Sequence, residues 1–395
     1  MAREDSVAAA NTLTAQFDTP IEHGVVLDDD TLRDGEQTVG VCFSVAQKVE
    51  IASMLLAAGV HRMNVGFPAV SEEERASVRA VLALGYADRE LYALARATRA
   101  DVDCVLDTGA KYIGVFVPIS DLHLDYKLKL DETAALARMR EVVRYAAGRG
   151  LHVGVGLEDA SRAPIDRTLR FANALAEDGA EFVNFCDTVG ILTPRSTERI
   201  VKQLVKGLGP MPLSVHIHND LGMAVANSIV AVQEGARQVQ GSFAGLGERA
   251  GNTCLEEVAV ILRVKYGLDL GIDLARLVAA AHRITEIAKL RVAPCKPILG
   301  ARVFAHESGI HVHGVTSEPA TYEAFPPQLV GRSHEIHFGK HSGLASIRYL
   351  AEREGITATE AALEVALAQI KQHAVEHGTP SDAQAVAILR AAVKP

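Results

Sequence analysis

The 395-residue sequence predicts a closed (β/α)8 barrel followed by a mostly helical C-terminal accessory region. Between residues 24 and 266, eight short runs rich in β-branched residues alternate with longer amphipathic stretches. This alternation is typical of parallel β-α units, and eight units in about 240 residues match the usual size of such a barrel. In addition, polar residues fall near the C-terminal ends of several different strands, where a barrel places its catalytic groups.

The expected strands can be read directly from the chain. They are Val25–Asp29, Arg62–Gly66, Leu91–Arg96, Tyr112–Val117, His152–Leu157, Phe182–Cys186, Leu213–His218 and Gln238–Phe243. Helical patterns rich in Ala, Leu, Glu, Lys and Arg separate them, as over Val45–Ala58 and Asp131–Gly148. An open doubly wound sheet would normally carry a glycine-rich phosphate turn after its first strand, and none is present.

The chain is therefore expected to divide into three parts. Residues 1–23 form an N-terminal extension, 24–266 the catalytic barrel, and 267–395 the accessory region that packs on or near the mouth of the barrel. Within the accessory region, 273–290 and 360–377 have helical patterns, whereas 294–313 has the glycine and histidine content of a loop.

Composition excludes several classes of protein. Hydrophobic residues make up 48% and charged residues 23%, which is ordinary for a globular protein. The net charge of −9 comes without any block of Lys and Arg, so nucleic acid and anionic membranes are not expected partners. Five scattered cysteines, no C-x-x-C pair, no secretory signal and no long apolar run indicate a cytoplasmic protein without disulfides.

The segment "HIHND" predicts a metal site. His216 and His218 are two residues apart at the end of the seventh expected strand, so both imidazoles point to the same side. Asp34 follows the first strand, which only one strand separates from the seventh in a closed barrel. Two imidazoles and a carboxylate suit Zn, Mn, Fe or, less well, Mg. The alternative is a pair of hydrogen-bonded histidines, but Asp34 and Asn252 converging on them favours the metal.

Two further charged residues have both a catalytic and a structural interpretation. Arg33 could clamp a carboxylate and stabilise charge on a ketone oxygen, or could form a salt bridge with Glu36 or Asp30. Glu158 ends the fifth strand, where a carboxylate is costly unless it is functional or is paired with Arg162. The segment "GLGERAGN", which ends at Asn252, follows the eighth strand and permits close approach to a ligand or simply closes the barrel.

Eight segments in order give the sequence a resemblance to a known family. They are "DDTLRDGEQ", "GFPAVSEEE", "EDASR", "DTVG", "HIHNDLGMAVAN", "GLGERAGN", "HESGIHVHG" and "GKHSG". Together they resemble the metal-dependent acyl-CoA condensing enzymes that include isopropylmalate and homocitrate synthases. The resemblance runs from about residue 24 to 345, and is nearest to the nitrogenase-associated type of homocitrate synthase.

The resemblance implies an activity, cofactors and roles for individual residues. Acetyl-CoA would condense with a 2-oxo acid in a Claisen-type step, and hydrolysis of the thioester would release CoA. A divalent ion (Mg, Mn or Zn) would be bound by Asp34, His216 and His218, with Asn252 in or near its shell. The remaining residues would bind substrate or transfer protons: Arg33, Gln37 and Thr188 for the oxo acid, and Glu158 with His311 and Tyr322 of a partner subunit in a homodimer for proton transfer.

The acceptor expected first is 2-oxoglutarate, which would make the chain a homocitrate synthase. One departure favours an alternative, because the second strand has Asn64 where most relatives have Glu, and His123 replaces an apolar residue. Less negative charge in the pocket would tolerate 3-phosphonopyruvate, as in a phosphonomethylmalate-type synthase. Asn64 could equally serve only to bind backbone. Arg96 is a candidate clamp for the distal anion in either case.

Other functions remain in competition with these. An isopropylmalate- or citramalate-type synthase would differ only in the acceptor. A lyase of the hydroxymethylglutaryl-CoA type would share the Arg-Asp and His-x-His elements but would lack "HESGIHVHG", which is present here. A non-catalytic protein on the same scaffold is disfavoured because every expected catalytic residue is intact.

Overall fold

The computed structural model describes residues 18–394 and places them in two compact units, 18–291 and 292–394. The boundary between the units falls after the residue at which the barrel was expected to end, because one further helix belongs to the barrel unit. The N-terminal extension predicted for residues 1–23 lies outside the described residues up to position 17, and so does residue 395.

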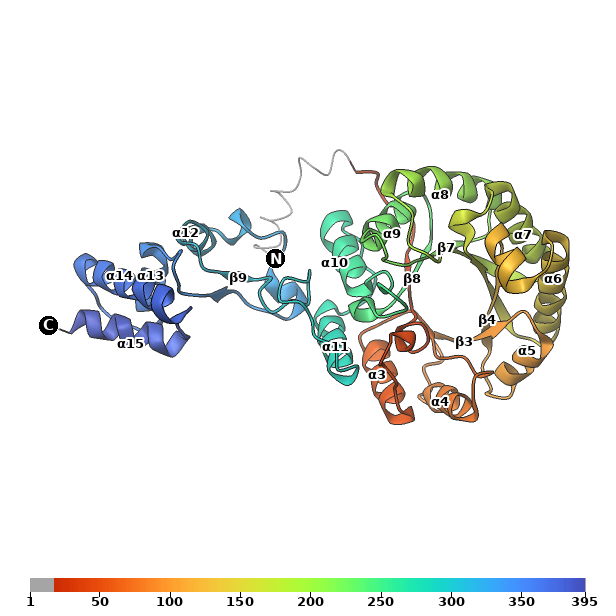
Figure 1. Cartoon of the computed structure of the whole chain (residues 1–395), viewed down its shortest axis with the longest axis horizontal. Coiled ribbons are helices and arrows are strands. Elements are labelled where there is room, and N and C mark those ends of the chain that lie inside the picture. The colour runs from red at the N-terminus through yellow and green to blue at the C-terminus, as the bar shows by residue number, and fades with distance from the viewer. Residues whose placement is uncertain (1–17, 395) are drawn as a thin grey trace. The chain divides into compact units, whose positions relative to one another are not determined.

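Eight parallel strands close into a barrel in the first unit (Figure 1). Each strand pairs with the next along the chain, and the first pairs with the last. Every expected strand is present: β1 (Val26–Asp29), β2 (Arg62–Asn64), β3 (Glu90–Arg96), β4 (Tyr112–Pro118), β5 (His152–Glu158), β6 (Ala180–Asp187), β7 (Leu213–Ile217) and β8 (Gln238–Gly241). The predicted (β/α)8 barrel is therefore confirmed.

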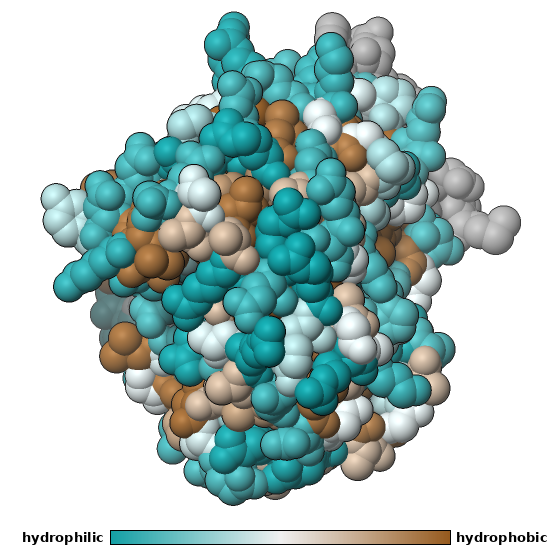
Figure 2. All heavy atoms as spheres, turned by 90° about the vertical axis from the view of Figure 1, so that its right-hand side faces the viewer, coloured by the Kyte–Doolittle hydropathy of each residue, from teal (hydrophilic) through white to brown (hydrophobic). Residues whose placement is uncertain are grey.

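Helices surround the barrel and cover the outer face of its strands (Figure 1). They are α3 (Val45–Ala57), α4 (Glu72–Leu82), α5 (Arg99–Leu106), α6 (Glu132–Gly148), α7 (Ile165–Glu177), α8 (Pro194–Leu208), α9 (Ala224–Gln233), α10 (Leu255–Tyr266) and α11 (Leu274–Ile287). Several begin at a side-chain cap, as where Ser44 accepts a hydrogen bond from the backbone N–H of Gln47. The side of the molecule that faces the viewer in Figure 2 is mainly hydrophilic.

The core of this unit lies between the strands and the helices. Outward-pointing strand residues such as Val115, Val155 and Val215 are fully buried against the helices. Both faces of a parallel barrel are covered, so its strands carry apolar runs rather than a simple polar alternation. Several polar residues on the strands, among them Asn184, His216 and Gln240, line the inside of the barrel.

The second unit is small and mostly helical, as predicted. Its elements are β9 (Ala305–His306), α12 (Gly309–Ser317), β10 (Glu335–Ile336), α13 (Leu344–Arg353), α14 (Glu360–His377) and α15 (Asp382–Val393). Helices α13, α14 and α15 share a hydrophobic core that includes Ile347, Leu350 and Ile370. The segment expected to be a loop over 294–313 contains the short strand β9 and the first turn of α12. No helix among residues 18–394 is both long and apolar enough to cross a membrane.

Candidate active site

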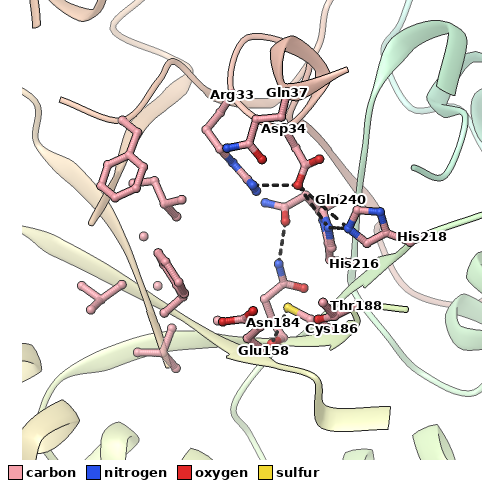
Figure 3. A pocket seen from close by; sticks show the side chains of 18 of the residues that line it. Arg33, Asp34, Gln37, Glu158, Asn184, Cys186, Thr188, His216, His218 and Gln240 are labelled. Carbon is pink, nitrogen blue, oxygen red and sulfur yellow. Dashed lines mark hydrogen bonds and ion pairs between the residues drawn. The ribbon is translucent and has the colours of Figure 1, made fainter. Parts of the chain in front are cut away.

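The carboxyl ends of the barrel strands enclose a cavity of about 420 Å³. Its polar lining residues come from different strands and the loops that follow them, and they face one another across the cavity (Figure 3). This is the end of the barrel at which catalytic groups were expected. Among the predicted site residues, the cavity lining includes Arg33, Asp34, Gln37, Glu158, Thr188, His216 and His218.

The three predicted metal ligands converge in this cavity. The Nε2 atoms of His216 and His218 lie 3.2 Å apart, and each lies within 4.0 Å of Oδ2 of Asp34. All three residues are buried. His216 belongs to β7 and His218 follows it, while Asp34 follows β1; the strand between them is β8, as the sequence predicted.

Electrostatics keeps these groups in the protonation states that bind cations. Burial lowers the pKa of His216 to about 3 and also lowers that of His218, so both imidazoles are neutral near pH 7. Burial is the largest single influence on Asp34 and acts to raise its pKa, but the Arg33 guanidinium, the two histidines and the hydrogen bond from Asn252 together outweigh burial and hold that pKa well below its usual range. A carboxylate and two neutral imidazoles are therefore present together.

The donor set fits a divalent metal ion. Zinc binds imidazole nitrogens and carboxylate oxygens at about 2.0–2.2 Å, so three atoms separated by 3.2–4.0 Å can surround one ion. Asn252 donates from Nδ2 to Oδ1 of Asp34 at 3.1 Å, while its own buried Oδ1 has no hydrogen-bond partner. Asn252 therefore contacts one of the three predicted ligands, and its place in or near the metal shell stays a prediction.

Arg33 joins the metal ligands to the rest of the cavity. Its guanidinium donates to Oδ2 of Asp34 at 2.7 Å and pairs with both carboxylate oxygens of Asp30. Burial raises the pKa of Asp30 to about 7, although Arg33 acts in the opposite direction. The sequence left open whether Arg33 is catalytic or forms a salt bridge with Asp30; the salt bridge exists, and the side chain still lines the cavity.

Glu158 lies across the cavity at the end of β5. Its two carboxylate oxygens accept from Nζ of Lys127 at 2.7 and 2.9 Å, and Nδ1 of His123 is 3.4 Å away. The structural alternative for Glu158 was a pair with Arg162, but Arg162 donates to Asp159 instead. The cation paired with Glu158 is therefore Lys127, whose side chain is half exposed.

Thr188 lies at the end of β6, beside Glu158. Its hydroxyl accepts from the backbone N–H of Asp159 at 2.8 Å, which orients the side chain toward the cavity. Its carbonyl accepts from Arg249 of the "GLGERAGN" loop at 2.6 Å. The loop after β8 is thereby fixed to the end of β6.

Three predicted substrate-binding residues lie outside the cavity lining. The guanidinium of Arg96 donates to both carboxylate oxygens of Asp101, at 2.8 and 3.0 Å, and its side chain is 60% exposed. Asn64 is fully buried, and its Oδ1 accepts from the backbone N–H of Gly66. His123 lies beside Glu158 and Asp159, at 3.4 Å and 3.8 Å from their carboxylate oxygens. The side-chain oxygen of Asn64 thus binds backbone, as its alternative interpretation expected, whereas its buried Nδ2 has no hydrogen-bond partner among the described residues.

His311 and Tyr322 belong to the second unit, where they lie together. Their rings are 4.3 Å apart with an interplanar angle of 36°. Tyr322 is 44% exposed and His311 is also exposed. Both side chains are therefore accessible on the surface of that unit.

Several cavity residues were not predicted from the sequence. Asn184 and Cys186 on β6 point inward, as does Gln240 on β8, and Lys127 and Arg249 lie in the loops. The signal for Asn184 and Cys186 was available, because residues two apart on a strand share a face. No such signal existed for Lys127, because it lies in the short helical turn His123–Leu128, where strand alternation does not apply.

Comparisons with known proteins agree with this geometry. Residues 25–284 match the family described as HMGL-like, and residues 298–378 match the homocitrate synthase post-HMGL domain-like family. The chain is 40% identical to 2-isopropylmalate synthase of Sulfolobus acidocaldarius over 91% of this chain and 94% of that protein. It is 40% identical to homocitrate synthase 1 of a Nostoc species over 89% of this chain and 93% of that protein.

The fold has solved counterparts. The crystal structure of Bacillus subtilis HMG-CoA lyase aligns with a TM-score of 0.64 at 21% identity, covering 71% of this chain and 98% of that one. The family assignment rests on two observations: the alignments cover most of this chain and of its relatives, and two domain families match it one after the other. The chain is an enzyme of the HMGL-like family, in the branch that carries the homocitrate synthase post-HMGL region.

Proposed function

We propose that this enzyme condenses acetyl-CoA with a 2-oxo acid and releases CoA by hydrolysis of the thioester. The observation that carries the proposal is the convergence of Asp34, His216 and His218 beside Arg33, with Glu158 across the same cavity. The relatives of this chain include both homocitrate and 2-isopropylmalate synthases. These enzymes differ in the 2-oxo acid acceptor, while the acetyl donor is shared.

The cavity supplies the groups that this reaction needs. A divalent ion, when bound, supplies Lewis-acid polarisation of the acceptor ketone. Arg33 would donate to the acceptor and stabilise negative charge on the ketone oxygen, and Thr188 would bind the acceptor's carboxylate. Glu158 would accept a proton from the acetyl methyl group, after which the new C–C bond forms and water cleaves the thioester.

The second unit would complete the reaction. We propose a homodimer in which His311 and Tyr322 of the partner subunit act with Glu158 in proton transfer. The support is the post-HMGL region itself, together with the exposure of both side chains. This region also favours a synthase over a lyase, because the sequence resemblance associates it with the condensing enzymes.

The acceptor expected from the sequence, 2-oxoglutarate, and its alternative, 3-phosphonopyruvate, both carry a second acidic group. Recognition of that group was expected to involve Arg96, with Asn64 tuning the charge of the pocket. Neither residue lines the cavity, and Oδ1 of Asn64 accepts from the backbone N–H of Gly66. The residues that support the condensation therefore do not depend on which side chain the 2-oxo acid carries.

The proposal is tested by the release of free thiol from acetyl-CoA by metal-loaded enzyme. Thiol release should depend on a 2-oxo acid and should disappear when a chelator removes the metal. Cleavage of hydroxymethylglutaryl-CoA without any 2-oxo-acid-dependent thiol release would instead assign the chain to the lyases.

A further inference from the structure

The second unit holds a cluster of three side chains that can bind a metal and to which the proposed reaction gives no role. His306 belongs to β9, Glu323 follows the short helical turn Pro319–Thr321, and His334 precedes β10. Each residue offers one ligand atom, and these atoms all lie within 4.8 Å of one another. The cluster is complete within one compact unit, because all three residues lie between positions 292 and 394.

The short sheet of the second unit brings the two histidines together. Strands β9 and β10 run parallel, and Ile336 lies opposite His306. His334 precedes Ile336 by two residues, which is the spacing at which the side chains of an extended chain point to the same side. The imidazoles of His306 and His334 are therefore diagonal neighbours on one side of the sheet, within reach of each other.

Glu323 joins the two histidines from a different segment. Its Oε1 lies 2.5 Å from Nδ1 of His334, and only 5% of its side chain is exposed. A carboxylate at that depth is costly unless a cation or a metal ion compensates its charge. A proton on His334 would be sufficient for an ion pair, but it would give His306 no part in that compensation.

His306 is the member of the cluster that an ion pair does not explain. Burial lowers its pKa, and the neighbouring His334 and His311 lower that pKa further, which favours the neutral imidazole. A neutral imidazole offers a nitrogen lone pair, and this is the form that binds a metal ion. Two imidazoles and one carboxylate are the donors of known zinc sites that keep a fourth position for water.

The spacing of the three donors is compatible with a single ion. Zinc binds imidazole nitrogen and carboxylate oxygen at about 2.0–2.2 Å, which places the ligand atoms of a tetrahedral site about 3.4 Å apart. The observed separations, from 2.5 Å to at most 4.8 Å, lie on either side of this value. Side-chain rotation can supply the difference, because 22% of the His334 side chain is exposed.

The cluster lies beside the two residues proposed for proton transfer. Tyr322 directly precedes Glu323 in the chain, and the rings of His306 and His311 lie 6.4 Å apart. Strands β9 and β10 have only two residues each, so their hydrogen bonds alone hold this region weakly. An ion bound by the three donors would join β9, the start of β10 and the segment that carries Tyr322.

We propose that His306, Glu323 and His334 form a second divalent-metal site, which binds Zn²⁺ and cross-links the segment of Tyr322 to the β9–β10 sheet. The inference does not depend on the proposed function, because none of the three residues lines the barrel cavity. The ion has to separate Glu323 from His334 before it binds. The site is therefore weaker than the one in the cavity, and it loses its ion on dialysis.

The test is a calorimetric titration of Zn²⁺ into the full chain with its cavity site already filled. After zinc loading and dialysis, the wild type should bind about one further equivalent per chain. Glu323→Gln removes the charged ligand with little change of shape, and His306→Gln removes the ligand on β9. Each should weaken the further binding by at least about a hundredfold, since the loss of even an outer-shell partner costs 10–100-fold.

Two control variants separate this cluster from other histidines of the second unit. His337→Ala removes an exposed imidazole that is paired with Glu335, and it should retain the further equivalent. His377→Ala breaks the His373–His377 pair on α14, whose rings lie 5.1 Å apart. Two histidines four residues apart on a helix can also hold zinc, so this variant tests the alternative location. It should likewise retain the further equivalent.

Three results would overturn the proposal. The absence of further binding in the wild type would show that Glu323 and His334 form only an ion pair. Equal binding by the wild type, Glu323→Gln and His306→Gln would place the ion elsewhere. Loss of binding in His377→Ala, with retention in Glu323→Gln, would place it on α14.

Hydrogen exchange tests the cross-link separately from the binding. Added Zn²⁺ should slow exchange of the backbone amides of residues 318–323 in the wild type and should leave it unchanged in Glu323→Gln. Exchange that zinc does not alter in the wild type would overturn the cross-link. Neither measurement uses thiol release, so failure of this inference and failure of the proposed function are distinguishable.

Discussion

Single residues set the charge state of the site. His216 and His218 are buried in a cavity that already holds the Arg33 guanidinium, so protonating either imidazole would add an unfavourable positive charge. The same guanidinium, together with the two histidines and the hydrogen bond from Asn252, keeps Asp34 ionised against the effect of burial. The three groups can therefore bind a cation over a wide range of pH, since protons compete weakly for the imidazoles.

Removal of one imidazole should abolish metal binding. We expect His216→Ala to reduce bound zinc from about one equivalent per chain to nearly none, with kcat/KM reduced by roughly a thousandfold or more. The measurement is metal content after dialysis, alongside thiol release. His152→Ala, which removes an exposed histidine paired with Glu181, serves as the control and should retain its metal. Equal metal content in the two variants would place the metal elsewhere.

The buried carboxyl group of Asp28 makes the free energy of unfolding depend on pH in a direction that can be predicted. Burial raises the pKa of Asp28 to about 6 from an ordinary value of 3.8. Between these two pH values the folded state therefore holds a proton that the unfolded state has released. The contribution of Asp28 to stability is complete below pH 3.8 and is lost as the pH rises through 6.

This loss can be isolated with Asp28→Asn. Between pH 4 and pH 7 the free energy of unfolding of the wild type should fall relative to that of the variant by about 2 kcal/mol. Denaturant unfolding at the two pH values measures the difference. A constant difference between the two proteins would mean that Asp28 is ionised at both values.

A residue of the site could be predicted from the sequence where the alternation of side chains along a strand determines which way it points. Strand alternation placed His216 and His218 on one face, and the position of Asp34 after β1 brought it to them. Arg96 could not be placed in the same way, since its partner Asp101 is in the helix that follows and the pairing turns the guanidinium aside.

At the scale of elements, helix α3 fixes two loops of the cavity. Lys48 of α3 is almost completely buried and its Nζ lies 2.6 Å from both Glu36 and Glu74. Glu36 in turn accepts from the backbone N–H of Phe43, and Glu74 from that of Phe67, which lines the cavity. One lysine thus connects the loop after β1, helix α3 and the loop before α4.

Loss of this lysine should be costly. Lys48→Ala leaves two partly buried carboxylates facing each other, so we expect it to lower the free energy of unfolding by about 3 kcal/mol. Arg283→Ala is the matched control, because it breaks an exposed pair with Glu50 on the same helix and should cost less than about 1 kcal/mol. Chemical denaturation compares them. Similar losses in the two variants would contradict the bridging role of Lys48.

The regular elements were more predictable than the irregular ones. All eight strands were identified because buried β-branched runs alternate with amphipathic helices at a regular spacing. The segment around His311 was read as a loop, because glycines and histidines at its start gave no helical periodicity. It forms helix α12 nonetheless, with Val312 and Val315 buried beneath its exposed histidines.

At the scale of the whole molecule, the proposed dimer can be tested by complementation. Glu158→Gln inactivates the barrel and His311→Ala the second unit, so each variant alone should release little thiol. Coexpressed in equal amounts, they should recover about a quarter of wild-type activity, because half the dimers are mixed and each mixed dimer has one intact site. No recovery would indicate that each chain uses its own His311.

The most direct test of the proposed reaction follows the acetyl carbons. The enzyme is incubated with its metal, the best 2-oxo acid acceptor and acetyl-CoA labelled with carbon-13 on both acetyl carbons. The account predicts free CoA and an acid product, one acetyl unit longer than the acceptor, that retains both labelled carbons. Free CoA with labelled acetate alone, and no labelled condensation product, would show simple thioester hydrolysis and would contradict the account.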